Sequence, residues 1–184
     1  MIQTKQDLRD YIAADNEAYF HKSRRERLIG ALALYPDHEI MRYKVFLRKA
    51  EYAFNTRGRS RLRLLYAFLW ERRKNRLGEK LGIEIETNCF GKGLQIYHGA
   101  GIVVNPAARI GDYCALHGGN CIGNNGKTQA VPIIGDHADL GFGSCVLGDV
   151  RLADHITVGS GAIVVRSCET DGAVLIGVPA REKG

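Results

Sequence analysis

In the first part of the chain, hydrophobic residues return every third or fourth position. This spacing is that of one face of an α-helix and predicts a helical region up to about residue 80. Pro36 opens a new segment with Asp37 as its predicted N-cap, and NTRGRS at 55–60 predicts a turn. Gly78 and Gly82 are predicted to end the helical pattern. The helical stretches are DLRDYIAADNEAYF (7–20), HEIMRYKVFLRKAEYAF (38–54) and RLRLLYAFLWERRKNRLGEKLG (61–82).

After residue 81 the period changes to six. This period is typical of the hexapeptide repeat of a parallel β-helix, in which each hexad forms one short strand and a bend. The aliphatic residue is expected to point inward, and the fifth residue of each hexad, usually small, to fill a tight corner. The aliphatic positions are Val104, Ile110, Leu116, Ile122, Ile134, Leu140, Val146, Leu152, Val158 and Val164, preceded by Phe90, Ile96 and Ile102 before a slip of two residues. The small positions are Ala108, Cys114, Gly126, Ala138, Ser144, Ala162 and Cys168.

Several positions depart from this repeat. Asn120 stands where a small residue is expected, and Val150 and Ile156 are larger than usual. The stretch NNGKTQAVP (124–132) has no aliphatic residue at 128 and is therefore predicted to leave the coil as a loop. Such loops commonly carry function. The two patterns together predict a small α-helical N-terminal domain, 1–80, and a β-helix domain, 81–184.

Composition places the chain among ordinary globular proteins, with 45% hydrophobic and 25% charged residues among 184. No apolar run approaches the roughly 20 residues that span a bilayer, and the polar N-terminus does not predict a secretory signal. Five cysteines without a CxxC pair indicate reduced, buried thiols rather than a disulfide framework or a zinc site. We therefore expect a cytoplasmic protein without a bound metal.

Positive charge is concentrated in one segment. Residues 21–80 hold 17 Lys and Arg against 6 Asp and Glu, whereas residues 81–184 hold 7 against 10. The arginines alternate with core-spaced apolar residues and no nucleic-acid-binding module is recognised, so a solvated helical face is predicted and nucleic-acid binding is not. An acidic polysaccharide or an anionic membrane surface is the alternative partner for this face.

Five motifs in the second half carry a family resemblance. They are HGAGIVVNPAARIG (98–111), IGNNGK (122–127), LGFGSCVLGDVRL (140–152), VGSGAIV (158–164) and IGVPAR (176–181). They resemble the left-handed parallel β-helix acyltransferases and are most similar to serine acetyltransferase and its relatives. The resemblance implies transfer of acetyl from acetyl-CoA to a hydroxyl, in a trimer whose active site and CoA groove lie between the β-helices of neighbouring subunits. It leaves open whether the helices pair trimers into hexamers, and the non-enzyme alternative is a trimeric β-helix scaffold.

By this resemblance, His98 matches the general base of the family. The chemistry needs such a group because an alcohol is a poor nucleophile at neutral pH, and an imidazole can accept its proton. A carboxylate about one coil earlier would orient the imidazole, and Glu84 and Glu86 are the candidates, with Glu84 aligning slightly better. The alternative for His98 is a surface histidine on a coil edge.

The resemblance also implies where CoA binds. Small residues that let the backbone approach the pantetheine arm are Gly143, Ser144, Ser160, Gly161 and Ala162. Lys127 in the loop and Arg181 near the end are the cations that could meet the CoA phosphates. As lone surface charges, each could equally be solvated.

Three positions differ from the serine enzymes. Those enzymes have an aspartate before the catalytic histidine and an Arg–His pair before the loop proline, where this chain has Tyr97, Ala130 and Val131. Without these ionic groups, free serine would leave its charges unpaired. We therefore expect a sugar hydroxyl in polysaccharide biosynthesis as the acceptor, with L-serine in cysteine biosynthesis as the alternative. The chain stops at REKG, so we expect none of the long tail with which many serine enzymes dock onto the next enzyme.

Overall fold

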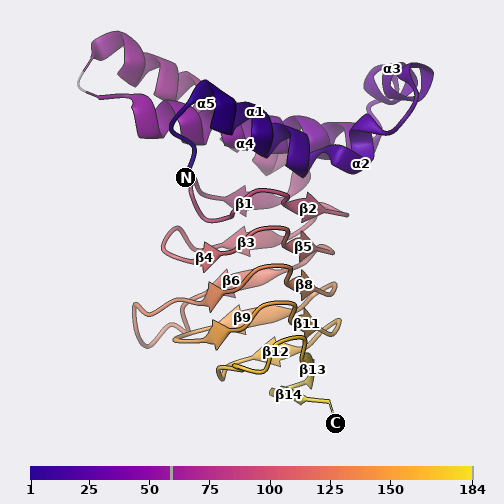
Figure 1. The fold of residues 1–184 in the computed structure, drawn as a ribbon, viewed down its shortest axis with the longest axis vertical. Coiled ribbons are helices and arrows are strands. Elements are labelled where there is room, and N and C mark those ends of the chain that lie inside the picture. The colour runs from indigo at the N-terminus through magenta and orange to yellow at the C-terminus, as the bar shows by residue number, and fades with distance from the viewer. Residues whose placement is uncertain (59, 184) are drawn as a thin grey trace.

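The computed structural model describes residues 1–58 and 60–183, without the side chains of Ala18 and Phe20. Within them, five helices precede a stack of short strands (Figure 1). The helices are α1 (Lys5–Asp15), α2 (Glu17–Phe20), α3 (Arg24–Leu32), α4 (Pro36–Thr56) and α5 (Arg61–Leu81). None of the described helices is long and apolar enough to cross a membrane.

The helical part follows the apolar pattern with three corrections. The N-cap of α4 is Tyr35, not Asp37, because Pro36 takes the first helical position, where its missing N–H costs nothing. Gly78 does not end α5 but lies inside it, where a Cβ would come within 2.4 Å of the Ile83 carbonyl oxygen. Gly82 does end the helix, as a left-handed C-cap with φ +66°.

The third correction is helix α3, which the apolar spacing did not predict. A capping box begins it: the Ser23 side chain accepts from the Glu26 N–H, and the Glu26 carboxylate accepts from the Ser23 N–H. The predicted turn at 55–60 does separate α4 from α5. Two residues named in the sequence analysis lie outside the described residues. They are Arg59, in this turn, and Gly184, the last residue of REKG.

Short strands follow α5 and stack into a coil. They are β1 (Ile83–Ile85), β2 (Gln95–Ile96), β3 (Ile102–Val104), β4 (Arg109–Ile110), β5 (Ala115–Leu116), β6 (Cys121–Gly123), β7 (Ile133–Ile134), β8 (Asp139–Leu140), β9 (Cys145–Leu147), β10 (Arg151–Leu152), β11 (Thr157–Val158), β12 (Ile163–Val164), β13 (Val174–Gly177) and β14 (Ala180–Glu182). They form three sheets, in the orders β1-β3-β6-β9-β12, β10-β7-β4 and β14-β13-β11-β8-β5-β2. Every pairing among them is parallel except that of β13 with β14, which closes the end of the coil.

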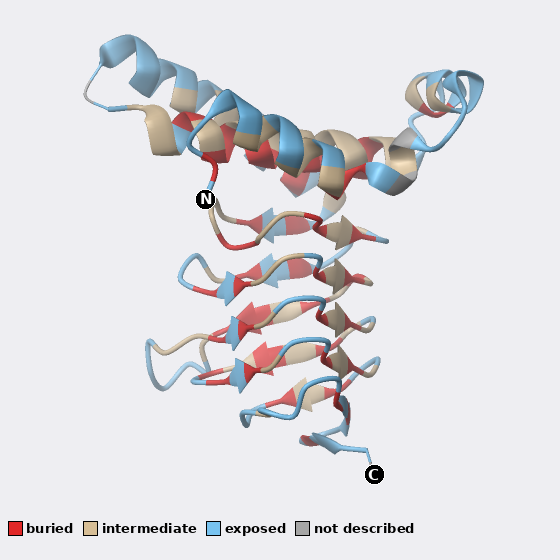
Figure 2. Cartoon of the chain, in the orientation of Figure 1, coloured by how far each residue is buried: buried red, intermediate tan, exposed pale blue. Residues whose placement is uncertain are grey.

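The six-residue period is confirmed by the sheet register. Along one sheet Ile96 pairs with Leu116, Leu116 with Leu140, and Leu140 with Val158. Every inward aliphatic residue of the repeat is buried, and so are the small residues Ala108, Cys114, Ala138, Ser144 and Ala162. Of the other two predicted corner residues, Cys168 is half-buried, and Gly126 fills no corner because it is exposed in the loop that leaves the coil. Figure 2 shows this buried interior running down the stack. The repeat therefore forms a continuous core, in which each aliphatic residue is covered by its equivalents above and below.

The stretch 124–132 leaves the coil between β6 and β7, as predicted, and projects from its side (Figure 1). Lys127 lies at its exposed tip. The Asn125 side chain stabilises the turn there by accepting from the Lys127 N–H (3.0 Å) and the Thr128 N–H (3.1 Å). The loop thus carries its own local structure.

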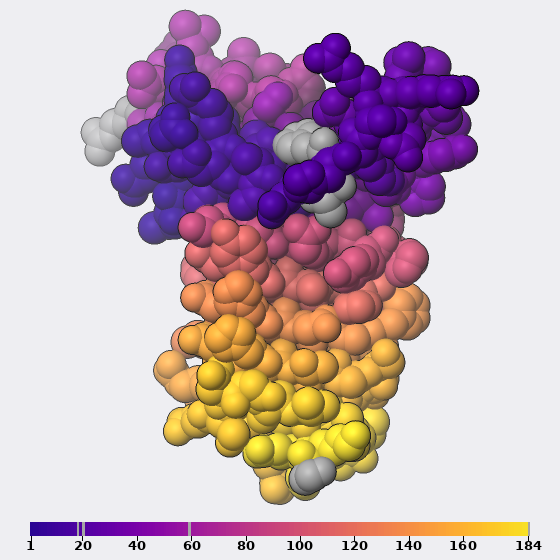
Figure 3. All heavy atoms as spheres, turned by 45° about the vertical axis from the view of Figure 1, so that its right-hand side comes forward, coloured from indigo at the N-terminus to yellow at the C-terminus, as the bar shows by residue number. Residues whose placement is uncertain are grey.

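A buried charged cluster joins the helices to the first coil. The Arg48 side chain is 0% exposed, and its Nε donates to Asp15 Oδ2 (2.7 Å) and its Nη1 to Glu51 Oε2 (2.9 Å). Arg48 Nη1 also donates to the Phe90 carbonyl (3.0 Å), and Asp15 Oδ1 accepts from the Leu94 N–H (2.9 Å). These contacts attach α1 and α4 to the segment before β2. The helices form a wider layer on top of the narrower coil (Figure 3).

Candidate active site

His98 lies at the corner between β2 and β3, directly under the end of α5. The corner packs so closely that a Cβ at Gly99 would lie 2.4 Å from the Leu81 carbonyl oxygen. Ala100 and Gly101 follow with positive φ (66° and 83°), which turns the chain into β3. His98 itself is exposed, and no hydrogen bond or ion pair of its side chain occurs in the described part of the chain. The ring is therefore accessible to a substrate.

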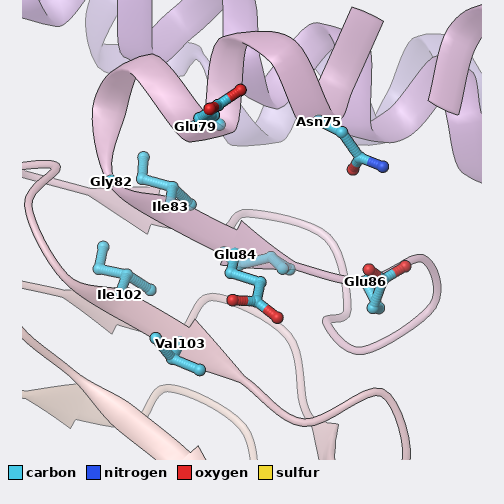
Figure 4. A pocket seen from close by; sticks show the side chains of 10 residues that line it. Asn75, Glu79, Gly82, Ile83, Glu84, Glu86, Ile102 and Val103 are labelled. Atoms are coloured by element: carbon cyan, nitrogen blue, oxygen red, sulfur yellow. The ribbon is translucent and has the colours of Figure 1, made fainter. Parts of the chain in front are cut away.

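The two candidate orienting glutamates lie on the neighbouring sheet face. Both line an open cavity of about 410 Å³ below α5, with Glu79, Asn75 and Val103 (Figure 4). Glu86 Oε2 is 3.4 Å from Lys74 Nζ, so its charge is partly compensated by α5. Glu84 has no such partner among the described residues. Neither glutamate contacts His98, and the choice between them stays a prediction that favours the unpaired Glu84.

At this corner, the imidazole that has a carboxylate partner is that of His117 and not that of His98. His117 Nε2 lies 2.7 Å from Asp139 Oδ1, and the Tyr97 ring packs over the imidazole with centroids 4.6 Å apart at 37°. Tyr97 and His117 follow the paired residues Ile96 and Leu116, so they occupy equivalent positions on adjacent coils. Sequence reasoning missed His117 and Asp139. The available signal was a histidine directly after an inward leucine, one coil after Tyr97.

Phe142 completes the exposed wall of this corner. His98, Gly118 and Phe142 each come two residues after members of one strand register. A Cβ at Gly118 would lie 3.1 Å from the Phe142 ring, so the ring occupies the space that a side chain at 118 would take. Phe142 is 54% exposed. This part of the coil therefore presents the imidazoles of His98 and His117 together with two accessible aromatic rings, Tyr97 and Phe142.

Asn120 fixes this corner from inside the coil. Its side chain is fully buried, and Oδ1 accepts from the Gly118 N–H (2.9 Å). Its Nδ2 donates to the Gly141 carbonyl (2.9 Å) and to Ser144 Oγ (3.0 Å). Asn120 departs from the small-residue pattern because it links the corner carrying His117 to the next one. An amide satisfied on both sides holds these backbone segments in one arrangement.

The proposed CoA-contacting residues lie at the two following corners. Gly143 and Gly161 have positive φ (71° and 69°). Their N–H groups already donate within the coil, to the Gly118 and Phe142 carbonyls (both 2.8 Å). The N–H groups of Ser144 and Ala162 are likewise used within the coil, and both side chains are buried. Contacts from this region to a pantetheine arm would therefore use carbonyl oxygens, the exposed Ser160 hydroxyl or the Ser160 N–H, which donates to no described residue.

The two predicted phosphate-binding cations belong to different segments. Lys127 is at the exposed tip of the loop, whereas Arg181 is on β14 and donates from Nη1 to the Ala180 carbonyl (2.9 Å). Ala130 and Val131 are half-buried at the base of the loop, before the buried Pro132. Tyr97 and His98 are consecutive in the sequence. The structure shows no contact between them and the four residues just named, which are Lys127, Ala130, Val131 and Arg181.

The buried cysteines Cys89 and Cys114 offer no second reactive group. All five are free thiols, and burial raises the pKa of Cys89 to about 11 and that of Cys114 further. A raised pKa leaves little thiolate at neutral pH, so these side chains pack rather than react. Within residues 1–58 and 60–183, no cluster of three or more His, Cys, Asp or Glu side chains has the arrangement of a metal site.

Comparisons with known proteins bear on both sequence and fold. No family model matches the chain. The chain is 33% identical over 103 residues to serine acetyltransferase of Synechococcus elongatus, covering 54% of this chain and 42% of that protein. It is also 33% identical over 103 residues to the Helicobacter pylori serine acetyltransferase, of which 60% is covered. The chain spans about half the length of these curated relatives.

Solved structures of serine acetyltransferases resemble the whole described fold. One in complex with cysteine has a TM-score of 0.72 at 22% identity, covering 98% of this chain and 71% of that chain. A soybean enzyme complexed with serine has a TM-score of 0.72 at 22% identity, covering 97% and 70%. One in complex with CoA has a TM-score of 0.70 at 22% identity, covering 97% and 71%. The predicted fold class, a left-handed parallel β-helix after a small helical part, is confirmed, as is the resemblance to the serine acetyltransferase-like hexapeptide-repeat proteins.

Proposed function

We propose that this protein is an acetyl-CoA-dependent O-acetyltransferase, with L-serine as acceptor and His98 as general base. The observation that carries the proposal is the accessible His98, at a coil corner within the motif that serine acetyltransferases share. The relatives in sequence are named serine acetyltransferases, and the structural neighbours include complexes with serine and with CoA. These names favour serine over the sugar hydroxyl that the residues at 97, 130 and 131 suggest.

The proposed reaction moves one acetyl group and one proton. His98 takes the proton from the acceptor hydroxyl as its oxygen attacks the thioester carbonyl. The C–S bond then breaks, the acetyl group stays on the oxygen, and the imidazolium returns the proton to the CoA sulfur. A hydrogen-bond donor near the carbonyl would stabilise the intermediate oxyanion. Glu84 is the proposed orienting carboxylate.

A sugar hydroxyl is the second candidate acceptor because of one feature of the corner. Tyr97, 56% exposed, presents an aromatic face and a hydroxyl beside His98, and the loop residues Ala130 and Val131 are uncharged. Aromatic faces pack on apolar surfaces, and a hydroxyl can hydrogen-bond a sugar. The assay must therefore compare both acceptor classes.

We also propose that the protein acts as a homotrimer in which the β-helix of a neighbouring subunit completes the CoA site. The corner with His98 is open to solvent in the single chain, and a thioester is best held in a site that excludes water. Pairing of trimers through the helices would give a hexamer. Light scattering of the purified protein distinguishes the two masses from that of a monomer.

The test of function is release of the CoA thiol from acetyl-CoA with a panel of acceptors. We expect turnover with L-serine to exceed turnover with any hexose or amino sugar, and mass spectrometry to find O-acetylserine. A sugar that is acetylated faster than serine would move the function to the second candidate. If no acceptor in the panel increases the release of CoA thiol, the result would favour a non-catalytic trimeric scaffold.

A further inference from the structure

His117 and Asp139 form an imidazole–carboxylate pair whose proton position is fixed by its geometry. An ionised carboxylate can only accept hydrogen bonds. The 2.7 Å contact from His117 Nε2 to Asp139 Oδ1 therefore places a proton on Nε2. In the neutral ring, Nδ1 then has its lone pair available, and no described residue bonds to that nitrogen. The pair thus offers an acceptor nitrogen backed by a full negative charge.

This pair is linked to the candidate general base through Tyr97. Tyr97, which precedes His98, packs directly over the His117 ring with centroids 4.6 Å apart. His98 and His117 are on adjacent coils, whose backbones are about 5 Å apart. His117 and Asp139 are 39% and 49% exposed, so a small molecule at His98 could reach them.

A free amino acid brings charges that a sugar does not. Its ammonium loses hydration on binding and must meet an anion or hydrogen-bond acceptors to recover that energy. Among the described carboxylates near this corner, Asp37 is paired with Lys22 and Glu86 is partly compensated by Lys74. Glu84 lies on the neighbouring sheet face, in the cavity that Glu86 also lines. Asp139 is the one that hydrogen-bonds to a residue packed against Tyr97.

We infer that His117 and Asp139 bind the ammonium group of an α-amino-acid acceptor, and so determine its specificity. The ammonium donates to His117 Nδ1, and the Asp139 carboxylate supplies the compensating charge through the ring. The pair thereby provides the anionic contact that Tyr97 cannot. This inference rests on the proposed function and specifies how that site would accept serine despite its uncharged residues at 97, 130 and 131.

The test compares two acceptors and two variants. Asp139→Asn keeps the shape and the hydrogen bond to Nε2 but removes the charge. We expect it to raise KM for L-serine about tenfold or more, because it removes the negative charge that compensates the ammonium. We expect kcat and KM for acetyl-CoA to change less than threefold. Turnover of 3-hydroxypropionate, which has the same hydroxyl but no ammonium, should not change.

A matched control exists at another corner of the coil. Asp171 Oδ1 pairs with His155 Nδ1 at 2.9 Å, and both side chains are exposed. Asp171→Asn makes the same chemical change away from His98 and should leave every kinetic constant within twofold. Melting temperatures of both variants should match that of the unaltered protein.

Three results would overturn the inference, and they are distinguishable. If Asp139→Asn keeps its KM for serine within twofold, the pair is only structural. If it lowers kcat and leaves KM unchanged, the pair acts on the chemistry and not on the ammonium. If the unaltered protein acetylates sugars but not serine, the proposed acceptor fails and the inference fails with it.

Discussion

The helical part and the coil of this protein bury different kinds of side chain. Among the described residues, the buried charged side chains all lie between residues 15 and 74, and they include Asp15, Lys44, Arg48 and Glu51. The buried polar side chains of the coil are Asn120 and Ser144, both uncharged.

This difference shows that the helical part adds buried charges to an apolar core that both parts share. The coil repeats one aliphatic layer, so its stability is the sum of similar apolar contacts between neighbouring turns. The helices meet the first coil through the same apolar core, to which Ile40, Leu47 and Leu77 contribute. They add buried ion pairs and hydrogen bonds to backbone carbonyls, which require correct geometry because buried charges are costly when unpaired. We infer that the cluster around Arg48 specifies how the helices sit on the coil, and the aliphatic layers supply the bulk of the stability.

Removing Arg48 should have the largest effect. Burial alone lowers the pKa of Arg48, but the Glu51 and Asp15 carboxylates outweigh this and raise it, so the side chain stays charged. Arg48→Met would leave two buried carboxylates without their partner, and we expect a loss of about 3–5 kcal/mol in the free energy of unfolding. Urea denaturation measures this. Arg25→Met, at an exposed position of α3, should change it by less than about 0.5 kcal/mol. Equal effects of the two variants would contradict the role of the cluster.

Truncating one inward aliphatic side chain should lower the free energy of unfolding by somewhat less. Ile122 is 1% exposed on β6 and pairs with Val104 and Val146 of the adjacent coils. Ile122→Ala should lower the free energy of unfolding by about 3 kcal/mol, through lost burial and a residual cavity. The control Val103→Ala is on the outer face of β3, 43% exposed, and should cost less than about 1 kcal/mol. A larger loss at Val103 would show that the coil is not held by its inward layers.

The smallest effect is a pH dependence that belongs to the helical part. Burial lowers the pKa of Lys44 to about 8, against 10.5 when exposed. Between these values the unfolded chain holds more protons than the folded one, so this residue makes stability rise with pH. Relative to Lys44→Met, the unaltered protein should gain about 2 kcal/mol from pH 8 to pH 10. Groups common to both proteins cancel in this difference. A difference that does not change with pH would mean that Lys44 is not desolvated.

The coil was predictable because its period is local. Leu116 and Val146 each follow a six-residue step that the sequence displays directly, and the HGAGIVV motif placed His98 at a corner. The pairing of His117 with Asp139 was not predictable, because it joins residues 22 positions apart and depends on how the coils align across the loop at 124–132. Arg48 has the residue type of a solvated face, and only the three-dimensional contacts show that it is buried. Helix α3 was missed because its start depends on the capping side chains of Ser23 and Glu26 and not on apolar spacing.

The most direct test of the proposed function is the rate of acetyl transfer to L-serine by His98→Ala. We expect kcat/KM to fall by about 10²–10⁴-fold, the range that general base catalysis contributes, with an unchanged free energy of unfolding because the side chain is exposed and makes no described hydrogen bond. A rate within twofold of the unaltered protein would show that this imidazole does not take the proton, and the account of the active site would be wrong.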